Sequence, residues 1–337
     1  MRAVVYHRFG PPEVLALTER PDPTPKPDQV RVRIRATTVT AAEAAMRRGE
    51  PLWGRVLIGF TRPRRRFRTL GTELAGVIDA VGRDVTRFRE GDEVYGFAGF
   101  DIGANADYLC LRETASLAPK PARLGFGDAA AAVDGATTAL FFLRDKGKLR
   151  AGQRALLVGA SGSIGTFAVQ LAKHLGAHVT GVCSAANAEL VRSLGADAVL
   201  DYGALDWAAT GDRWDVVFDT VGKSSFAHAR RALGPRGVFL PTVISARSVL
   251  EGLLTPLFAG RRLVGGMSVD KRDALRYVRE LLDDGALRVV VDRRLPLTSI
   301  VEAHRLVDSG RKRGNVIIDV SAAEPRGLAA RTEDLRA

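Results

Sequence analysis

The fold of this chain is decided by the turn Gly159-Ala160-Ser161-Gly162-Ser163-Ile164-Gly165, which lies at the centre of residues 154–201. The uninterrupted apolar run at 155–158, just before the turn, is typical of a strand buried on both faces of a parallel sheet. After the turn, apolar residues recur up to Leu175 at a spacing that keeps one face of a helix against that sheet. A second strand is expected at 178–183, so the unit is strand, glycine turn, helix, strand.

The turn has the features of a dinucleotide phosphate site. Gly162 lets the main chain approach a pyrophosphate, Gly165 lets the helix lie close to the strand, and the helix N-terminus adds partial positive charge. The spacing A-x-G-x-x-G, with Ala160 in the first small position, is weak alone but strong between a strand and a helix. The alternative is a tight strand-to-helix turn that binds no ligand.

The end of the second strand indicates which nicotinamide cofactor would bind. An NAD site usually places Asp or Glu about 20 residues past the turn, where the carboxylate holds the ribose hydroxyls. Residues 183–187 are Cys-Ser-Ala-Ala-Asn, with no carboxylate to repel a 2′-phosphate. Ser184 and Asn187 can donate hydrogen bonds, so the sequence favours NADP(H) over NAD(H), although no Arg or Lys stands at 185–187 to pair with that phosphate.

Length and composition indicate about two domains with substantial cores, because the chain has 337 residues of which 46% are hydrophobic. The N-terminus has no signal-peptide pattern, and no run approaches about 20 unbroken apolar residues. We therefore expect a cytoplasmic protein with no membrane span. Two cysteines, Cys110 and Cys183, cannot build a disulfide framework, which agrees with a reducing compartment.

The formal net charge is +12, and most of it is arginine spread along the chain, as on a solvated surface. One local cluster stands out, the basic run at 62–68 with the sequence R-P-R-R-R-F-R. Such a cluster can attract an anionic substrate, a nucleic acid or a membrane surface. No aromatic stacking array or recognised nucleic-acid motif lies beside it, which disfavours nucleic acid as a partner.

Hydrophobic periodicity predicts two kinds of structure along the chain. The first 120 residues or so indicate a mostly β domain, with an alternating strand at 29–36 and a short helix at 40–48. Residues 124–143 predict two helices broken near Asp134-Gly135. Beyond the glycine turn, strands and helices alternate in the rhythm of a doubly wound parallel sheet. Further strands are expected at 198–202, 215–221, 237–242, 263–267, 289–295 and 315–320, and helices at 270–284 and 299–307.

A family resemblance rests on six stretches that cover almost the whole chain from 1 to 320. They are HRFGPPEVL at 7–15, GTELAG at 71–76, FREGDEVYG at 88–96, QLAK at 170–173 after the glycine turn, LGAD at 194–197 and RGNVI at 313–317. In this combination and order they resemble a zinc-independent member of the medium-chain dehydrogenase/reductase superfamily, in its quinone oxidoreductase-like branch.

The resemblance implies an α/β fold, with a Rossmann doubly wound parallel sheet plus a GroES-like mostly β domain. The GroES-like substrate and catalytic domain would comprise 1–123, completed by 268–320, and the Rossmann domain 124–267, followed by a flexible tail at 321–337. Relatives of this kind typically bind NADPH and reduce quinones or enones, commonly as homodimers. The dimer edge here would be the strand near 263–267.

The resemblance also bears on zinc. Zinc alcohol dehydrogenases hold their metal with Cys and His ligands, including a Gly-His-Glu motif. The matching residues here are Gly71-Thr72-Glu73, and Thr40 occupies the region expected to supply a first Cys. Two cysteines cannot build a four-Cys structural site, and the five histidines show no metal-ligand spacing. We therefore expect no zinc.

Candidate site residues follow from the motif and the resemblance together. Thr40 is the candidate catalytic residue, replacing an Asn that relatives often carry, and a helix N-cap is the alternative role for it. Trp53 and Phe60 are candidate substrate-pocket residues. The cofactor-binding candidates are Thr138, Ala160, Ser161, Gly162, Ser163, Ile164, Gly165, Ser184, Asn187, Tyr202, Thr220, Val221 and Asn315.

The sequence thus predicts an NADPH-dependent, zinc-independent oxidoreductase that transfers hydride to quinones or α,β-unsaturated carbonyl compounds. Without a Lewis acid, the protein would mainly position and polarise the substrate carbonyl. One alternative is a low-turnover NADP(H)-binding regulator or nucleic-acid binder that uses the basic cluster 62–68. Another is an NADP-dependent alcohol or aldehyde dehydrogenase.

Overall fold

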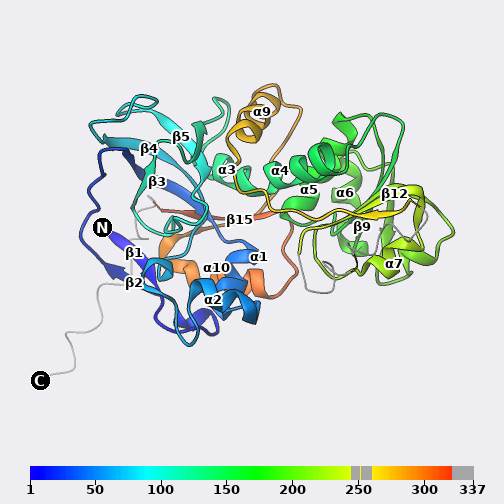
Figure 1. Ribbon diagram of the computed structural model, residues 1–337, viewed down its shortest axis with the longest axis horizontal. Coiled ribbons are helices and arrows are strands. Elements are labelled where there is room, and N and C mark those ends of the chain that lie inside the picture. Colours follow the sequence, from blue (N-terminus) through cyan, green and yellow to red (C-terminus); the bar gives the residue numbers. More distant parts are fainter. Residues whose placement is uncertain (244–250, 252–259, 321–337) are drawn as a thin grey trace, which may run out of the picture.

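The computed structural model describes residues 1–243, 251 and 260–320. Two lobes lie side by side, and helices α3 (Phe126–Ala131) and α4 (Val133–Leu140) lie between them (Figure 1). The predicted tail at 321–337 lies outside the described residues. Each lobe is built on its own sheet.

One lobe is a parallel six-stranded sheet in the order β10-β9-β8-β11-β12-β13. The order runs outward in both directions from the β8–β11 pair, which makes the sheet doubly wound. The prediction of a Rossmann-type sheet is therefore confirmed. Its strands are β8 (Arg154–Val158), β9 (His178–Cys183), β10 (Ala198–Asp201), β11 (Trp214–Asp219), β12 (Leu233–Pro241) and β13 (Arg262–Leu263), and its helices include α5 (Ser163–His174), α6 (Ala188–Ser193) and α7 (Phe226–Arg230).

The other lobe is mostly β and is closed by the C-terminal part of the chain. Strand β15 (Asn315–Asp319) pairs antiparallel with β3 (Gln29–Thr38), which places Ile317 opposite Thr38. Seven strands form this sheet, in the order β14-β15-β3-β4-β5-β7 with β6 also on β3, and β1 and β2 form a separate pair. The remaining strands are β1 (Arg2–Val5), β2 (Ala16–Glu19), β4 (Glu73–Val81), β5 (Glu93–Phe97), β6 (Tyr108–Arg112), β7 (Ser116–Pro119) and β14 (Val291–Pro296).

Strand β3 shows why the sequence folds this way. Val30, Val32 and Ile34 are buried in the core of the β lobe, whereas the arginines between them are more exposed. The alternation follows from the period of two along a strand with one face on a core. Helices α1 (Ala41–Arg48) and α10 (Ile300–Asp308) pack against each other in this lobe, α2 (Arg55–Ile58) lies beside them (Figure 1), and α9 (Arg272–Asp283) contacts β7 and α4.

The central helical stretch breaks at a different place from the one predicted. The helices α3 and α4 meet at Ala132, not near Asp134-Gly135, and a π-helical turn continues α4 over Phe141–Lys146. Gly135 stays inside α4 because the helix passes close to α5 there: an added Cβ would lie 2.9 Å from the Phe167 ring. A glycine can mark close packing as well as a break.

The same stretch, Phe126–Lys146, is the one helix among the described residues that is long and apolar enough to cross a membrane. Within the protein, however, 78% of its apolar window is buried. Its first part, α3, packs on strands β3, β4 and β15 of the β lobe. Its second part, α4, packs on α5 of the other lobe. The apolar character is therefore explained by its place in the core.

Candidate functional site

The glycine turn has two glycines with different structural roles. A Cβ at Gly165 would lie 2.1 Å from the carbonyl oxygen of Gly159, so the close approach of α5 to β8 requires glycine. A Cβ at Gly162 would meet only that same oxygen, at 3.4 Å, so space remains above it. Gly162 is the N-cap of α5, and no side-chain cap of this helix is found among the described residues. The first N–H groups of α5 are therefore available to an anion.

The turn continues into the body of the nucleotide lobe. Ala160 is buried beneath the turn, and Ile164, at the start of α5, packs partly buried against the same core. Thr220 holds the neighbouring strand end, because its Oγ1 donates to the Val158 carbonyl at 2.8 Å. Val221 follows it and is 46% exposed, with its side chain against Gly159. These positions line the carboxyl ends of β8 and β11, where ligands of open α/β sheets bind.

Ser161 and Asn187 meet across the end of β9. Asn187 Nδ2 donates to Ser161 Oγ at 3.1 Å, and Asn187 Oδ1 is buried with no partner in the described part of the chain. A buried acceptor without a donor costs about 1–3 kcal/mol unless a ligand or water supplies one. Ser184 is half-buried where the chain leaves β9, and Tyr202, at the end of β10, is 66% exposed. This edge therefore has an open acceptor for a hydroxyl group.

Asp201 is a carboxylate near this edge that the sequence pattern did not reveal. It ends β10 and lies opposite Cys183 in the sheet register. Its Oδ1 accepts a hydrogen bond from the Gly203 backbone at 2.9 Å. The residues at 183–187 have no acidic side chain, but a neighbouring strand brings one close.

The start of β15 joins the β lobe to the glycine turn, and we call this region of contact the junction. Gly314 N donates to the Ser161 carbonyl at 2.8 Å, and Ser163 Oγ donates to Asn315 Oδ1 at 2.6 Å. Asn315 Nδ2 in turn donates to the Val290 carbonyl at 3.1 Å. The structure therefore brings together Ser163 and Asn315, two candidates that lie 152 positions apart in the sequence.

Thr40 lies on the same side of the junction. Val39, the first residue after β3, donates its N–H to the Val316 carbonyl at 3.0 Å, so the next residue, Thr40, lies close to β15. Thr40 is the N-cap of α1 and forms a capping box with Glu43: its Oγ1 accepts from Glu43 N at 3.1 Å. The helix-cap alternative is thus present in the structure. The hydroxyl hydrogen takes no part in that bond and can be donated elsewhere.

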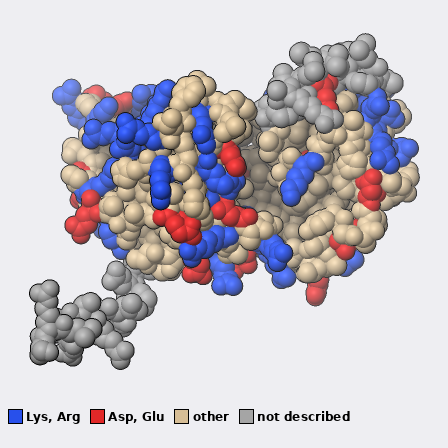
Figure 2. Space-filling view, turned by 90° about the horizontal axis from the view of Figure 1, so that it is seen from below, with Lys and Arg blue, Asp and Glu red and all other residues tan. Residues whose placement is uncertain are grey.

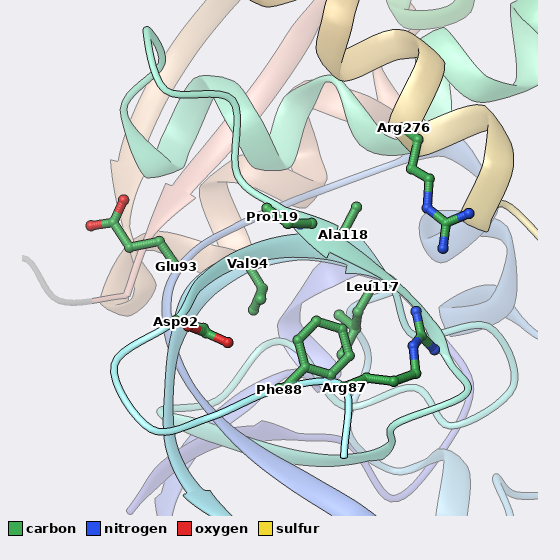
Figure 3. Close-up of a pocket in the computed structure, with 9 residues that line it drawn as sticks. All are labelled: Arg87, Phe88, Asp92, Glu93, Val94, Leu117, Ala118, Pro119 and Arg276. Atoms are coloured by element: carbon green, nitrogen blue, oxygen red, sulfur yellow. The ribbon is translucent and has the colours of Figure 1, made fainter. Parts of the chain in front are cut away.

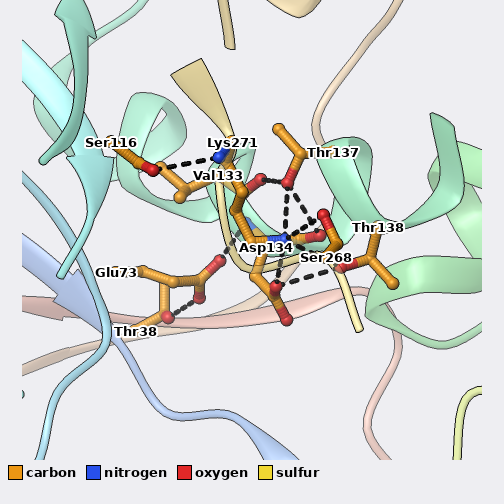
Figure 4. Close-up of polar contacts among 9 residues, drawn as sticks. All are labelled: Thr38, Glu73, Ser116, Val133, Asp134, Thr137, Thr138, Ser268 and Lys271. Carbon is orange, nitrogen blue, oxygen red and sulfur yellow. Dashed lines mark hydrogen bonds and ion pairs between the residues drawn. The ribbon is translucent and has the colours of Figure 1, made fainter. Parts of the chain in front are cut away.

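A buried polar network links the two lobes behind these residues (Figure 4). Thr38 Oγ1 donates to the carboxyl group of Glu73, and Asp134 N donates to Glu73 Oε1 at 2.5 Å. The Asp134 carboxylate accepts from Thr138 Oγ1 at 3.0 Å and pairs with Lys271 Nζ at 2.9 Å. Thr138 is therefore held within the network, with only 9% of its surface exposed.

Lys271 is the cation at the centre of this network and is 1% exposed. Its Nζ also donates to the Thr137 and Thr138 hydroxyl groups at 3.0 and 3.1 Å, and lies 4.9 Å from the centre of the Phe97 ring. A Cβ at Gly135, next to Asp134 in α4, would lie 3.0 Å from Ser163 Oγ. The network therefore directly adjoins the glycine turn.

Two buried carboxyl groups at the junction have pKa values that are raised toward neutral pH. Burial and, second to it, the charge on Asp134 together raise the pKa of Glu73 to about 8. Burial also raises the pKa of Glu43 to about 7, against the hydrogen bond of 2.7 Å that Asn105 Nδ2 donates to it. Removal from water disfavours the charged form of a carboxyl group, which explains both directions.

Comparisons with known proteins support a family assignment. Residues 26–133 match the alcohol dehydrogenase GroES-like domain family, and residues 194–318 match the zinc-binding dehydrogenase family. The mouse mitochondrial NAD(P)H oxidoreductase RTN4IP1 is 33% identical over 75% of this chain and 70% of its own length. A chloroplastic quinone oxidoreductase, QR1 of Triphysaria versicolor, is 30% identical over 74% of this chain and 78% of its own.

Solved structures agree with the sequence comparisons. The quinone oxidoreductase from Coxiella burnetii superposes with a TM-score of 0.87 at 27% identity, covering 95% of this chain and 99% of its own. The chain belongs to the quinone oxidoreductase-like branch of the medium-chain dehydrogenase/reductase superfamily. It is an oxidoreductase of that type, and the predicted combination of Rossmann and GroES-like folds is confirmed.

Metal-ligand chemistry is weakly represented in this member of the superfamily. Within 1–243, 251 and 260–320, no three His, Cys, Asp or Glu side chains come together as a group that could hold a metal ion. Thr72 and Thr40 occupy the positions where the resemblance places ligands in zinc enzymes. Zinc independence stays a prediction.

Two candidates for the substrate pocket lie on the outside of the β lobe. Trp53, in the 3-10 turn Leu52–Gly54, is 64% exposed, and Phe60, just after α2, is 70% exposed. Neither contacts the buried network by any hydrogen bond or ring contact found in the described chain. Their role in binding substrate stays a prediction.

One hollow in the described structure is lined by other residues than these candidates. It encloses about 490 Å³ against β5 and β7, where Arg87 and Arg276 approach it from different elements beside Phe88 (Figure 3). None of the predicted site residues lines it. We therefore place the candidate site at the junction, on residue chemistry and contacts, and not at this hollow.

Sequence analysis missed Asp134, Lys271 and Glu73 as site residues. Asp134 interrupts an Ala-rich apolar stretch, which is a signal that could have been used, and Glu73 stands in the quoted motif at 71–76. Lys271 has no local signal, since its partner lies 137 positions earlier in the chain. A further missed group is Lys312, whose Nζ donates to the Gly314 carbonyl at 2.6 Å and whose pKa burial lowers to about 8.

Proposed function

We propose that this protein is an NADPH-dependent, zinc-independent reductase of quinones or α,β-unsaturated carbonyl compounds. The observation that carries the proposal is the room above Gly162, beside the uncapped N-terminus of α5. A dinucleotide pyrophosphate needs both the backbone approach and the free N–H groups. Family membership supports the reaction class, and the name of the mouse relative supports the cofactor class.

The residues present fit a nicotinamide dinucleotide. The first turn of α5 would hold the pyrophosphate, and the open acceptor Asn187 Oδ1 would bind an adenosine ribose hydroxyl. We favour NADPH because residues 183–187 carry no carboxylate. A carboxylate near the ribose would oppose this preference. Asp201 supplies one only from the neighbouring strand, and it already accepts a hydrogen bond from the Gly203 backbone. When bound, the nicotinamide supplies a hydride.

Reduction of a quinone or an enone takes one hydride and one proton, and the chain supplies groups for the second requirement. Thr40 does not supply the proton itself, but its free hydroxyl hydrogen can donate a hydrogen bond that polarises a substrate carbonyl oxygen. Lys312 lies beside Gly314 and Asn315, and with its pKa lowered to about 8 it can release a proton near neutral pH. We assign Thr138 and Asn315 to positioning at the nicotinamide end, since both are held by the junction contacts.

The proposal is tested with a matched pair of glycine variants. Gly162 and Gly125 are both helix N-caps with extended backbone, at φ −82° and −68°, and both have room for a side chain. We expect Gly162→Val to fold normally but to lose NADPH binding by about a hundredfold, because the side chain would fill the pyrophosphate position. Gly125→Val should bind NADPH like the parent protein. Fluorescence titration with NADPH and NADH measures both.

Turnover is measured on the same proteins with a panel of small quinones and enones. The parent protein should oxidise NADPH faster than NADH with at least one acceptor. Tight binding without turnover would favour the low-turnover regulator or nucleic-acid binder, and turnover only with alcohols or aldehydes would favour the dehydrogenase alternative. Unchanged NADPH binding in Gly162→Val would contradict the proposed cofactor site.

Two further expectations belong to the same proposal. A homodimer would form through β13, which is the last strand of the described six-stranded sheet. Light scattering on the purified protein gives its mass and tests this directly. A cytoplasmic location is tested by fractionation of the cells that produce it, and a protein found only in another compartment would contradict it.

A further inference from the structure

The segment 52–68 exposes apolar side chains on one face. Leu52, Trp53, Val56, Leu57 and Phe60 are between 55% and 71% exposed. The first four have the spacing of one side of a helix and lie within 52–58, which are helical, and Phe60 follows beyond Gly59, where the helix has ended. Ile58 points inward and is buried. This face is therefore an apolar stripe with no partner in the described protein.

The same segment is strongly basic. Six arginines, at 55, 62, 64, 65, 66 and 68, and no acidic residue occur between 52 and 68. Within the described residues none of these arginines pairs with a carboxylate, whereas many arginines elsewhere do, such as Arg31 with Asp79 and Arg294 with Asp128. Figure 2 looks from below onto the lobe that carries α2, where Lys and Arg side chains gather beside uncharged surface.

The arginines and the apolar stripe form one continuous surface. Arg64 Nη2 donates to the Val56 carbonyl at 2.9 Å, which ties the basic run to α2. Arg66 Nη2 donates to the Phe100 carbonyl at 3.1 Å, and Phe100 adds a further ring that is 56% exposed. These hydrogen bonds go to backbone carbonyls, and Arg66 also lies over the Phe67 ring, so neither arginine is paired with a carboxylate of the described residues.

We propose that segment 52–68 docks this protein on a lipid bilayer that carries anionic headgroups. Apolar side chains from a short helix enter the boundary between headgroups and acyl chains, and Trp and Phe are favoured there. Arginines at the rim pair with lipid phosphates, each contributing about tenfold or less to affinity at the surface of an anionic leaflet. Both halves of the segment have a role in this arrangement.

Other occupants fit the surface less well. In a twofold dimer through this face the patch would meet itself, so that six uncompensated arginines would face six more. A nucleic acid would satisfy the arginines but would leave exposed Leu52, Val56 and Leu57, which neither stack on bases nor bond to phosphates. An anionic bilayer satisfies the charge and the apolar stripe together.

The three tryptophans of the chain allow a direct measurement. Trp207 and Trp214 are 6% and 1% exposed in the nucleotide lobe, so Trp53 is the exposed one. The full chain is mixed, without cofactor, with vesicles of phosphatidylcholine and phosphatidylglycerol or of phosphatidylcholine alone. We expect the Trp53 emission to shift to shorter wavelength only with the anionic vesicles, and co-sedimentation with them to fall as salt is raised.

Paired variants distinguish vesicle binding through this surface from nonspecific electrostatic or hydrophobic adsorption. Leu57→Glu and the triple change Arg64→Ala, Arg65→Ala and Arg66→Ala should each lower vesicle binding by about tenfold to a hundredfold. The apolar control is Leu17→Glu on β2 of the same lobe, where Leu17 is 37% exposed. The charge control replaces the exposed Arg83, Arg89 and Arg213 with alanine. Both controls should bind vesicles like the parent protein.

Equal binding to both kinds of vesicle, or equal losses in the test and control variants, would overturn the proposal. So would a lack of vesicle binding together with DNA or RNA binding that the 64–66 triple change abolishes, since that result assigns the surface to nucleic acid. These measurements involve neither NADPH nor turnover. The docking proposal can therefore be wrong while the reductase proposal is right, and the reductase proposal can be wrong while the docking proposal is right.

Discussion

The junction network and segment 52–68 differ in whether their cationic side chains are paired with carboxylates of the described residues. At the junction, Lys271 is buried, and its Nζ pairs with the Asp134 carboxylate and donates to three hydroxyl groups. In segment 52–68, the six arginines have no carboxylate partner in the described chain, and most are exposed. Buried charges must be paired because their desolvation is costly, whereas exposed ones need not be. Charges in the first region are therefore part of the fold, and those in the second are explained only by something outside it.

The sharpest test of this contrast removes the buried cation. Lys271→Met should lower the free energy of unfolding by about 3 kcal/mol, because it leaves the Asp134 carboxylate without its cation. We expect the lower end of the usual range, since the Asp134 side chain is 29% exposed and water can partly compensate. Urea unfolding measures the loss.

The double change Lys271→Met with Asp134→Asn is the matched control. It removes both charges, so it should recover part of the loss in a double-mutant cycle. A loss below about 1 kcal/mol for Lys271→Met alone would mean that the junction tolerates an unpaired carboxylate as well as the surface does, and the contrast would be lost.

The second test uses pH, because the buried carboxyl groups contribute stability that depends on protonation. The folded-state pKa of Glu43 is raised to about 7 from 4.5, so the folded protein retains a proton that the unfolded chain releases in this window. Stability from Glu43 is then full below pH 4.5 and declines up to about pH 7, by at most about 1.4 kcal/mol per pH unit. Glu73, with its pKa near 8, adds a change of the same sign.

Glu43→Gln should flatten this decline. Glutamine mimics the protonated acid and can still accept the hydrogen bond from Asn105 through its side-chain oxygen. We expect unfolding curves at pH 5 and pH 8 to differ less in the variant than in the parent protein, with the variant more stable at pH 8. A parent protein that is more stable at pH 8 than at pH 5, with the variant following it, would show that Glu43 ionises freely in the folded state.

The sequence predicted the parts of the fold that rest on local signals. The glycine turn, the alternation in β3 and the helix that starts at Ser163 are each encoded within a few residues. The break in the central helix was predicted wrongly, at 134–135 in place of Ala132, because glycine was taken as a breaker. In the folded chain Gly135 instead permits contact with Phe167, a residue 32 positions away.

Long-range partners and exposure account for what the sequence could not predict. Nothing around position 271 indicates that its lysine meets Asp134, because the two come together only when α4 and the start of α9 pack. Likewise, apolar residues at helical spacing usually face a core, so the pattern at 52–60 did not show that its stripe faces solvent. Hydrophobic periodicity shows which face of a helix is apolar, but it does not show what that face contacts.

The smallest expected effect completes the contrast. The triple change Arg64→Ala, Arg65→Ala and Arg66→Ala removes three positive charges, yet we expect the free energy of unfolding to change by no more than about 0.5 kcal/mol. None of the three has a carboxylate to lose, and the bonds from Arg64 and Arg66 go to backbone carbonyls near exposed side chains. Urea unfolding of this variant beside Lys271→Met measures both in the same units. A loss above about 2 kcal/mol would show that the basic run supports the fold, and its unpaired charges would then no longer require a partner outside the protein.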